Sequence, residues 1–173
     1  STLPLMRSST TSVPTLVFKA QGASADLGRR AAEESYDQIK RALRGSDMVF
    51  VTAGEGGGTG SGGAPVVARI AREVGALTVG IVTTPFHFEG TRKMHIAEQG
   101  IEQLVEHVDS LIVVLNQNLF DVMDEDASLE DAVKAGKLSA DAGRRAGRAV
   151  ALYGFVDERP EREVDGHVLQ VVL

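Results

Sequence analysis

The chain has 173 residues, of which 43% are hydrophobic and 24% are charged, and its net charge is -6. This length and composition are those of one folded domain and exclude an intrinsically disordered chain. The absence of cysteine excludes disulfides and thiolate metal sites, and the negative charge disfavours a nucleic-acid partner. No apolar run approaches the roughly 20 residues of a membrane helix, so we expect no direct membrane insertion and a cytoplasmic location.

The first part of the chain predicts a loose lead-in over residues 1–21, with a short strand at 14–18. A helix is predicted from Ser24, a suitable N-cap, to Gly45, because apolar and small residues recur every four positions. Residues 47–53 (DMVFVTA) are apolar and rich in β-branched side chains, which predicts a strand buried on both faces.

The strand–helix pattern then repeats. Helices are predicted over residues 63–74 and 89–107, the second with a core-facing stripe that includes Val105, and buried strands over 77–83 and 109–115. Strands that alternate with helices of this length predict an α/β, Rossmann-like three-layer sandwich with a mainly parallel sheet.

The last third gives a weaker signal. Residues 117–150 predict one or two Ala-rich helices, and residues 151–156 and 167–173 predict a hairpin whose second strand closes the edge of the sheet. We therefore divide the chain into the lead-in, a core over residues 22–121, and a divergent helical segment with a hairpin over 122–173.

The most informative feature is a glycine cluster between the second predicted strand and the following helix. Seven glycines lie between positions 54 and 63, in the run Gly-Glu-Gly-Gly-Gly-Thr-Gly-Ser-Gly-Gly. Glycines allow successive backbone N–H groups to face one point, and a helix N-terminus adds partial positive charge there. The cluster therefore predicts a phosphate-binding loop, to which Thr59 and Ser61 can add hydroxyl donors.

Two common phosphate loops do not fit this cluster. A P-loop needs a lysine after its last glycine, and the cluster contains none. Gly58, Gly60 and Gly63 have the spacing of a dinucleotide fingerprint, but Thr83 and Thr84 stand where the ribose-binding carboxylate should follow.

The run FVTAGEGGGTGSGGAP over residues 50–65 resembles the signature of the tubulin/FtsZ superfamily, and specifically the FtsZ-type bacterial cell-division GTPases of alphaproteobacteria. The likeness continues in the same order through residues 28–39, 77–90, 97–101, 107–114 and 116–120. It covers roughly residues 22–121.

The resemblance implies a guanine-nucleotide site for GTP or GDP, with Mg²⁺ as the accompanying ion. The implied contacts are Gly54, Gly56, Gly57, Gly58, Thr59 and Gly60 at the phosphates, Glu89 at the ribose, Lys93 at ribose or phosphate, and Asn116 near the guanine. It also implies FtsZ-like subunits as partners, head-to-tail polymerisation coupled to hydrolysis, and a place at the division site.

The chain also departs from the family pattern. It lacks the family's first β-α-β unit with its second glycine loop, and we find no catalytic loop, so no catalytic residue is assigned. Glu55 replaces a methionine within the anion loop, where a carboxylate repels phosphate unless it turns outward or a cation bridges it. Lys93 replaces an arginine, and Val133 replaces an aromatic residue that stacks on guanine.

Other candidate features leave alternatives open. The aromatic segment 84–88 (TPFHF) fits either a base-gripping loop or a packed loop beneath the site. The histidines and the acidic run after residue 120 lack metal-ligand spacing, so no metal site is predicted. The leading hypothesis is FtsZ-type nucleotide binding; the alternatives are a non-catalytic fragment that associates with FtsZ filaments, and a generic anion or dinucleotide binder.

Overall fold

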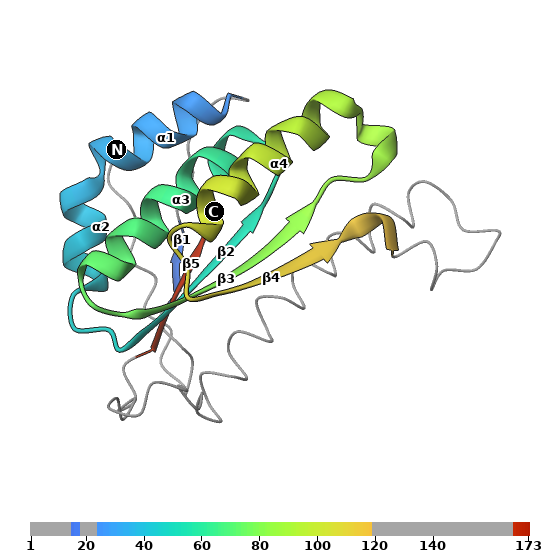
Figure 1. Ribbon diagram of the computed structural model, residues 1–173. Coiled ribbons are helices and arrows are strands. Elements are labelled where there is room, and N and C mark those ends of the chain that lie inside the picture. The colour runs from blue at the N-terminus through green and yellow to red at the C-terminus, as the bar shows by residue number, and fades with distance from the viewer. Residues whose placement is uncertain (1–14, 18–23, 119–167) are drawn as a thin grey trace.

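The computed structural model describes residues 15–17, 24–118 and 168–173 (Figure 1). The elements, in chain order, are β1 (Thr15–Val17), α1 (Ala25–Glu34), α2 (Tyr36–Leu43), β2 (Met48–Gly54), α3 (Gly58–Glu73), β3 (Leu77–Thr84), the 3-10 turn η1 (His87–Glu89), α4 (Thr91–Val105), β4 (Ser110–Leu115) and β5 (Val168–Val172). None of the described helices is long and apolar enough to span a membrane.

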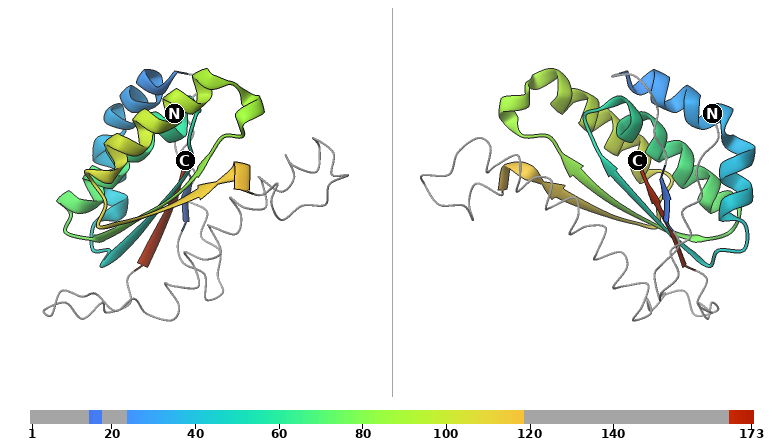
Figure 2. Two further views of the ribbon diagram at one scale, coloured as in Figure 1. Left: turned by 45° about the vertical axis from the view of Figure 1, so that its right-hand side comes forward. Right: turned by 180° about the vertical axis from the view of Figure 1, so that it is seen from behind.

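The strands form one five-stranded sheet in the order β1-β5-β2-β3-β4, and every adjacent pair is parallel. The predicted α/β, Rossmann-like class with a parallel sheet is therefore confirmed. All four described helices lie on the same face of the sheet (Figures 1 and 2). The third layer of the predicted sandwich would lie on the other face, and the segments that could form it fall outside the described residues.

The main core lies between the sheet and these helices. It contains inward-facing residues of β2 such as Val49 and Val51, together with Val67 and Ile70 of α3 and Leu104 of α4. A second buried cluster uses the alternate residues of β2 and β3 on the opposite face. Because successive strand residues point to opposite faces, β2 is buried on both sides, as its continuous apolar sequence predicts.

Two helix boundaries differ from the sequence prediction. The helix predicted over residues 24–45 is split at Ser35 into α1 and α2, and Ser24 is the N-cap residue without a capping side-chain hydrogen bond. The helix predicted to begin at Gly63 begins at Gly58, inside the glycine cluster. Glycine is a poor helix former, but here close contacts with neighbouring backbone hold the first turns in place.

These close contacts join α1 to α3. A Cβ at Gly28 would lie 1.9 Å from the Gly58 carbonyl oxygen, and a Cβ at Gly62 would lie 1.9 Å from the Ala25 carbonyl oxygen. The two helices therefore touch backbone to backbone at a distance that only glycine permits.

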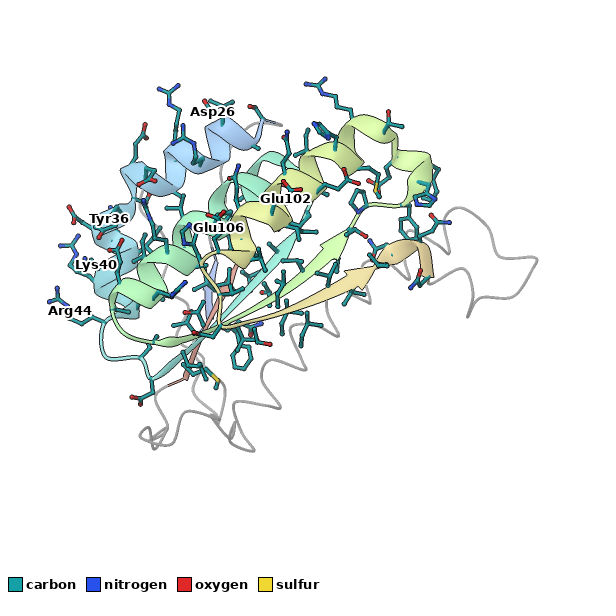
Figure 3. All side chains as sticks on the ribbon, viewed as in Figure 1. Asp26, Tyr36, Lys40, Arg44, Glu102 and Glu106 are labelled. Atoms are coloured by element: carbon teal, nitrogen blue, oxygen red, sulfur yellow. The ribbon has the colours of Figure 1, made fainter. Side chains whose placement is uncertain are left out.

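A polar cluster ties α2 to the end of α3. Lys40 Nζ donates hydrogen bonds to the Tyr36 hydroxyl oxygen at 2.8 Å and to Glu73 Oε2 at 3.3 Å, while the Tyr36 hydroxyl donates to the same carboxylate oxygen. Tyr36 and Lys40 lie side by side on the outer surface of α2 (Figure 3). The cluster is solvent-exposed, so its contribution to stability is small.

The strand over residues 109–115 was predicted to be buried, and this prediction is wrong. β4 lies at the end of the sheet, and its Ile112, Val113 and Leu115 are 50%, 38% and 47% exposed. Val105 of α4, expected to face the core, is also exposed. The reason is positional: α4 packs mainly over α3 and β3, which leaves the outer side of β4 uncovered by the described elements.

The predicted C-terminal hairpin is also wrong for its second strand. β5 runs parallel to both neighbours and lies between β1 and β2, so it neither pairs as a hairpin nor closes an edge. The Thr52 hydroxyl donates a hydrogen bond to the Val171 carbonyl at 3.1 Å, and the Leu173 N–H donates to the Thr52 carbonyl at 2.9 Å. The predicted first hairpin strand and the Ala-rich helices, beyond residue 118, lie outside the described residues.

Candidate functional site

The glycine loop lies at the carboxyl end of β2 and leads directly into α3. Because the sheet is parallel, the carboxyl ends of β2, β3 and β4 meet at one edge, which is where α/β folds bind ligands. The N-cap residue of α3 is Gly57, which has no side chain to cap the helix. The helix N-terminus therefore presents backbone amides and partial positive charge toward the space beyond this edge.

Two glycines of the loop are required by its shape. Gly56 has φ +97°, in the left-handed region that favours glycine. A Cβ at Gly60 would lie 2.0 Å from the Gly54 carbonyl oxygen, so the first turn of α3 rests directly on the end of β2. A Cβ at Gly57, in contrast, would meet no atom within 4 Å.

Ser61 holds the loop in this conformation. Its hydroxyl oxygen accepts a hydrogen bond from the Gly56 N–H at 2.8 Å, and both groups are buried. The Glu55 N–H extends the β2–β3 pairing by donating to the Thr83 carbonyl at 2.8 Å. Ser61 was predicted to offer a hydroxyl donor to a ligand. In the structure, its hydroxyl oxygen accepts a hydrogen bond from the loop itself.

Glu89 and Lys93, predicted from the resemblance, form an ion pair beside the loop. Lys93 Nζ lies 2.9 Å from Glu89 Oε2, and Glu89 Oε1 accepts a hydrogen bond from the Phe86 N–H at 3.0 Å. Partial burial raises the pKa of Glu89, but the hydrogen bonds from Lys93 and Phe86 outweigh it and hold this pKa below its usual value. A Cβ at Gly56 would lie 3.1 Å from the Lys93 carbonyl oxygen, so the structure brings the ion pair and the glycine loop together.

Asn116 lies two strands away from the loop, at the same edge of the sheet. It directly follows β4, is buried, and has no hydrogen-bond partner on Oδ1 within the described part of the chain. The adjacent Gln117 accepts a hydrogen bond from the His87 N–H at 3.1 Å, which ties this segment to η1. Nothing in the local sequence pattern around Gln117 indicates this contact.

In the aromatic segment after β3, one phenylalanine packs in the core as one of the two alternatives predicted, and the other is exposed. Phe86 is buried, whereas Phe88 is 47% exposed. Their rings are stacked with centroids 5.0 Å apart and an interplanar angle of 12°. Phe86 therefore packs beneath the edge, and Phe88 adds an exposed aromatic surface beside Glu89.

Glu55 is neither turned outward to solvent nor bridged by a neighbouring cation. It is 6% exposed, and neither of its carboxylate oxygens has a hydrogen-bond partner among the described residues. A Cβ at Gly100 would lie 2.5 Å from Glu55 Oε2 and 2.8 Å from Ser61 Cβ, which places the carboxyl group between α3 and α4. Burial raises the pKa of Glu55 to about 7, and the Ser61 hydroxyl beside it lowers that pKa by less.

Comparison with known proteins identifies the class to which this fold and loop belong. The family model described as "Tubulin/FtsZ family, GTPase domain" matches residues 18–124, more than half of the chain. The chain therefore belongs to the Tubulin/FtsZ family.

Its relatives within that family are cell-division proteins. The chain is similar to the "Cell division protein FtsZ" of Rickettsia typhi and to that of Rickettsia prowazekii, each 54% identical over 113 residues. These matches cover 65% of this chain and 25% of each relative, so the chain matches about a quarter of their length. A solved structure, an empty FtsZ dimer of M. jannaschii, superimposes with a TM-score of 0.68 at 41% identity, over 83% of this chain and 40% of that one.

Proposed function

We propose that the chain carries the phosphate-binding part of a guanine-nucleotide site in an FtsZ-type GTPase domain of a bacterial cell-division protein. The observation that supports it most is the glycine loop, whose uncapped helix N-terminus opens at the carboxyl edge of a parallel sheet. The proposed ligand is GTP or GDP, and the proposed location is the cytoplasm, at the division site.

The described residues offer chemically suitable groups for each part of the nucleotide. Backbone amides from Gly57 to Gly60 would bind the phosphates, while the Gly56 N–H is held by Ser61. The lowered pKa of Glu89 keeps its carboxylate ionised at neutral pH, so it can accept hydrogen bonds from ribose hydroxyls. Lys93 offsets the charge of Glu89 and so limits its repulsion of the phosphates.

The proposal also assigns a guanine contact to Asn116 and includes Mg²⁺ as the ion that accompanies the nucleotide. The unpartnered Oδ1 of Asn116 is a suitable acceptor for an N–H of the guanine edge. Mg²⁺ that accompanies a nucleotide takes many of its ligands from phosphate and water. Among the described residues, no group of three His, Cys, Asp or Glu side chains could bind a metal.

Hydrolysis would require a second FtsZ-like subunit stacked head to tail on this one. A second candidate is a non-catalytic interaction role, in which the chain associates with FtsZ filaments; the similarity to cell-division proteins supports either candidate. Phosphate release that begins only after an intact FtsZ is added would support a site completed by the partner. Co-sedimentation with filaments without nucleotide binding would support the second candidate.

The direct test is a titration of the purified chain with fluorescently labelled GTP, with labelled ATP for comparison. Gly57→Asp is the informative variant, because its carboxylate would enter the phosphate position without meeting other atoms. Gly57→Ala is the matched control, since it adds a side chain at the same place without charge. We expect saturable GTP binding by the wild type and the alanine variant and none by the aspartate variant; no saturable GTP binding at millimolar nucleotide would refute the proposal.

A further inference from the structure

Glu55 is a buried ionisable group for which the proposed nucleotide site has no role. Its carboxyl group lies against Ser61 in the first turn of α3 and against Gly100 in the middle of α4. Both carboxylate oxygens are inaccessible and unpartnered among the described residues. A buried carboxylate without a compensating partner is costly when charged and far less so when protonated.

None of the ion pairs that the described residues form on the surrounding elements includes Glu55. On α1, Arg29 pairs with Asp26 at 2.8 Å, and on α4, Lys93 pairs with Glu89. The neighbouring β3 contributes uncharged threonines at its carboxyl end.

The remaining ionisable groups near this interface are exposed or distant along their helix. On α4, His95 and Glu98 are exposed and face each other at 3.9 Å. On α3, the described sequence contains no ionisable residue between Gly58 and Arg69. No described cation therefore forms an ion pair with Glu55, and its protonation is governed by burial and by the Ser61 hydroxyl.

Solvent comes close to this buried group from one side. A pocket of about 190 Å³ lies among α1, α3 and α4, and both Ser61 and Gly100 line it. The same two residues contact the Glu55 carboxyl group. The pocket therefore adjoins two of the residues that surround the Glu55 carboxyl group.

We propose that Glu55 makes anion binding at the glycine loop proton-linked, so that the loop binds nucleotide phosphates when Glu55 is protonated and releases a proton when it loses them. This inference rests on the proposed function and adds a mode of regulation to the same site.

The physical reason is that the phosphate group and the Glu55 carboxylate are attracted by the same positive field, at the N-terminus of α3. The N-terminus of α3 has a partial positive charge of about half a unit, which attracts a phosphate group or the Glu55 carboxylate alike. An ionised Glu55 carboxylate beside the first turn of α3 weakens this field and repels phosphate through a poorly screened interior. By linkage, the same coupling makes bound phosphate favour the protonated carboxyl group.

The coupling would operate in the neutral range. Burial brings the pKa of Glu55 to about 7, so a modest shift in pH changes its charge. A coupling of the usual size changes affinity roughly 5- to 150-fold.

The test measures GDP affinity from pH 6 to pH 8.5 for the wild type, Glu55→Gln and Glu55→Met. Glu98→Gln, which removes an exposed carboxylate on α4, is the matched control. We expect the Kd of the wild type and the control to rise about tenfold over this range, and that of both Glu55 variants to stay within about threefold. Titration of the nucleotide phosphate itself is common to all four proteins and cancels in the comparison.

A second readout uses isothermal titration calorimetry at pH 7 in two buffers with different ionisation enthalpies. A greater proton uptake on GDP binding by the wild type than by both Glu55 variants would support the inference. Equal pH dependence in the wild type and the Glu55 variants would overturn it while the proposed function stands. Failure of every protein to bind GDP at any pH would refute the proposed function and this inference together.

Discussion

The strands β2 and β4 have similar sequences but different environments. Both are short runs of mainly apolar residues rich in β-branched side chains, and both end at the carboxyl edge of the sheet. β2 is hydrogen-bonded on both sides and is buried except at its last residue, whereas β4 is bonded on one side and largely exposed. Apolar composition therefore identifies a strand of a parallel sheet, but the burial of that strand depends on which elements lie beside it.

The largest expected effect comes from Gly60→Ala, at the start of α3 beside β2. The new methyl group would lie 2.0 Å from the Gly54 carbonyl oxygen. Because that oxygen belongs to the backbone, the loop must move to make room for the methyl group. We expect a loss of about 4 kcal/mol in the free energy of unfolding, or failure to fold. Urea denaturation checks this, and an unchanged midpoint would show that α3 does not rest on β2. Gly57→Ala is the control and should stay within about 0.5 kcal/mol, because a Cβ there meets no atom within 4 Å.

The next effect is a pH dependence of stability due to Glu55. Its pKa is raised from 4.5 to about 7 on folding, so the folded state binds more protons between these values. Stability due to this group is therefore greatest below about pH 4.5, falls as pH rises toward 7, and is constant above that. The total loss is about 3 kcal/mol.

Glu55→Gln should remove this component of the pH dependence and make the domain more stable than the wild type above pH 7. Thermal unfolding from pH 5 to pH 8.5 measures the difference between the two proteins. A difference that does not change with pH would show that Glu55 is ionised throughout.

A paired substitution tests the burial difference between the two strands directly. Val51 of β2 is fully buried and Val113 of β4 is 38% exposed. We expect Val51→Ala to reduce the free energy of unfolding by about 2 kcal/mol, and Val113→Ala to reduce it by less than about 1 kcal/mol. Chemical denaturation of the two variants side by side gives the ratio, and equal losses would mean that β4 is covered in solution.

The smallest effect concerns the exposed side of β4. An apolar edge strand without charge favours pairing with other chains, and a lysine in the strand opposes it. Ile112→Lys should therefore slow aggregation at high protein concentration while changing stability by less than about 0.5 kcal/mol. Light scattering over time measures this against Glu98→Lys, an exposed control on α4. Equal aggregation of the two variants would show that β4 does not drive association.

The sequence was sufficient to predict the parallel α/β fold, because the alternation of apolar strands and amphipathic helices is encoded locally. It did not predict that α3 begins at Gly58, since the contacts that stabilise this turn come from Gly54 and from Gly28 of α1. The period-two pattern near residue 170 correctly indicated a strand but contains no information about its partners. Composition alone likewise did not distinguish the edge strand β4 from the inner strands.

For the candidate site, the sequence predicted the position of the glycine loop but not the burial of Glu55. The motif placed the glycine loop at the carboxyl end of a strand, and the structure confirms that position. Glu89 and Lys93 are four positions apart on adjoining helical turns, and they do meet. The burial of Glu55 could not be foreseen, because it depends on the close approach of Gly100, which lies 45 positions further along the chain.

The position of β5 also determines the order in which this sheet can form. β5 separates β1 from β2, and its Val171 carbonyl accepts a hydrogen bond from Thr52, 119 positions earlier in the chain. During synthesis, β2, β3 and β4 can associate early, but β1 has no described neighbour until residues 168–172 have emerged from the ribosome. Contacts of such long sequence separation slow folding. The nascent chain would therefore expose the β5-facing side of β2, next to the glycine loop, until residues 168–172 have been synthesised.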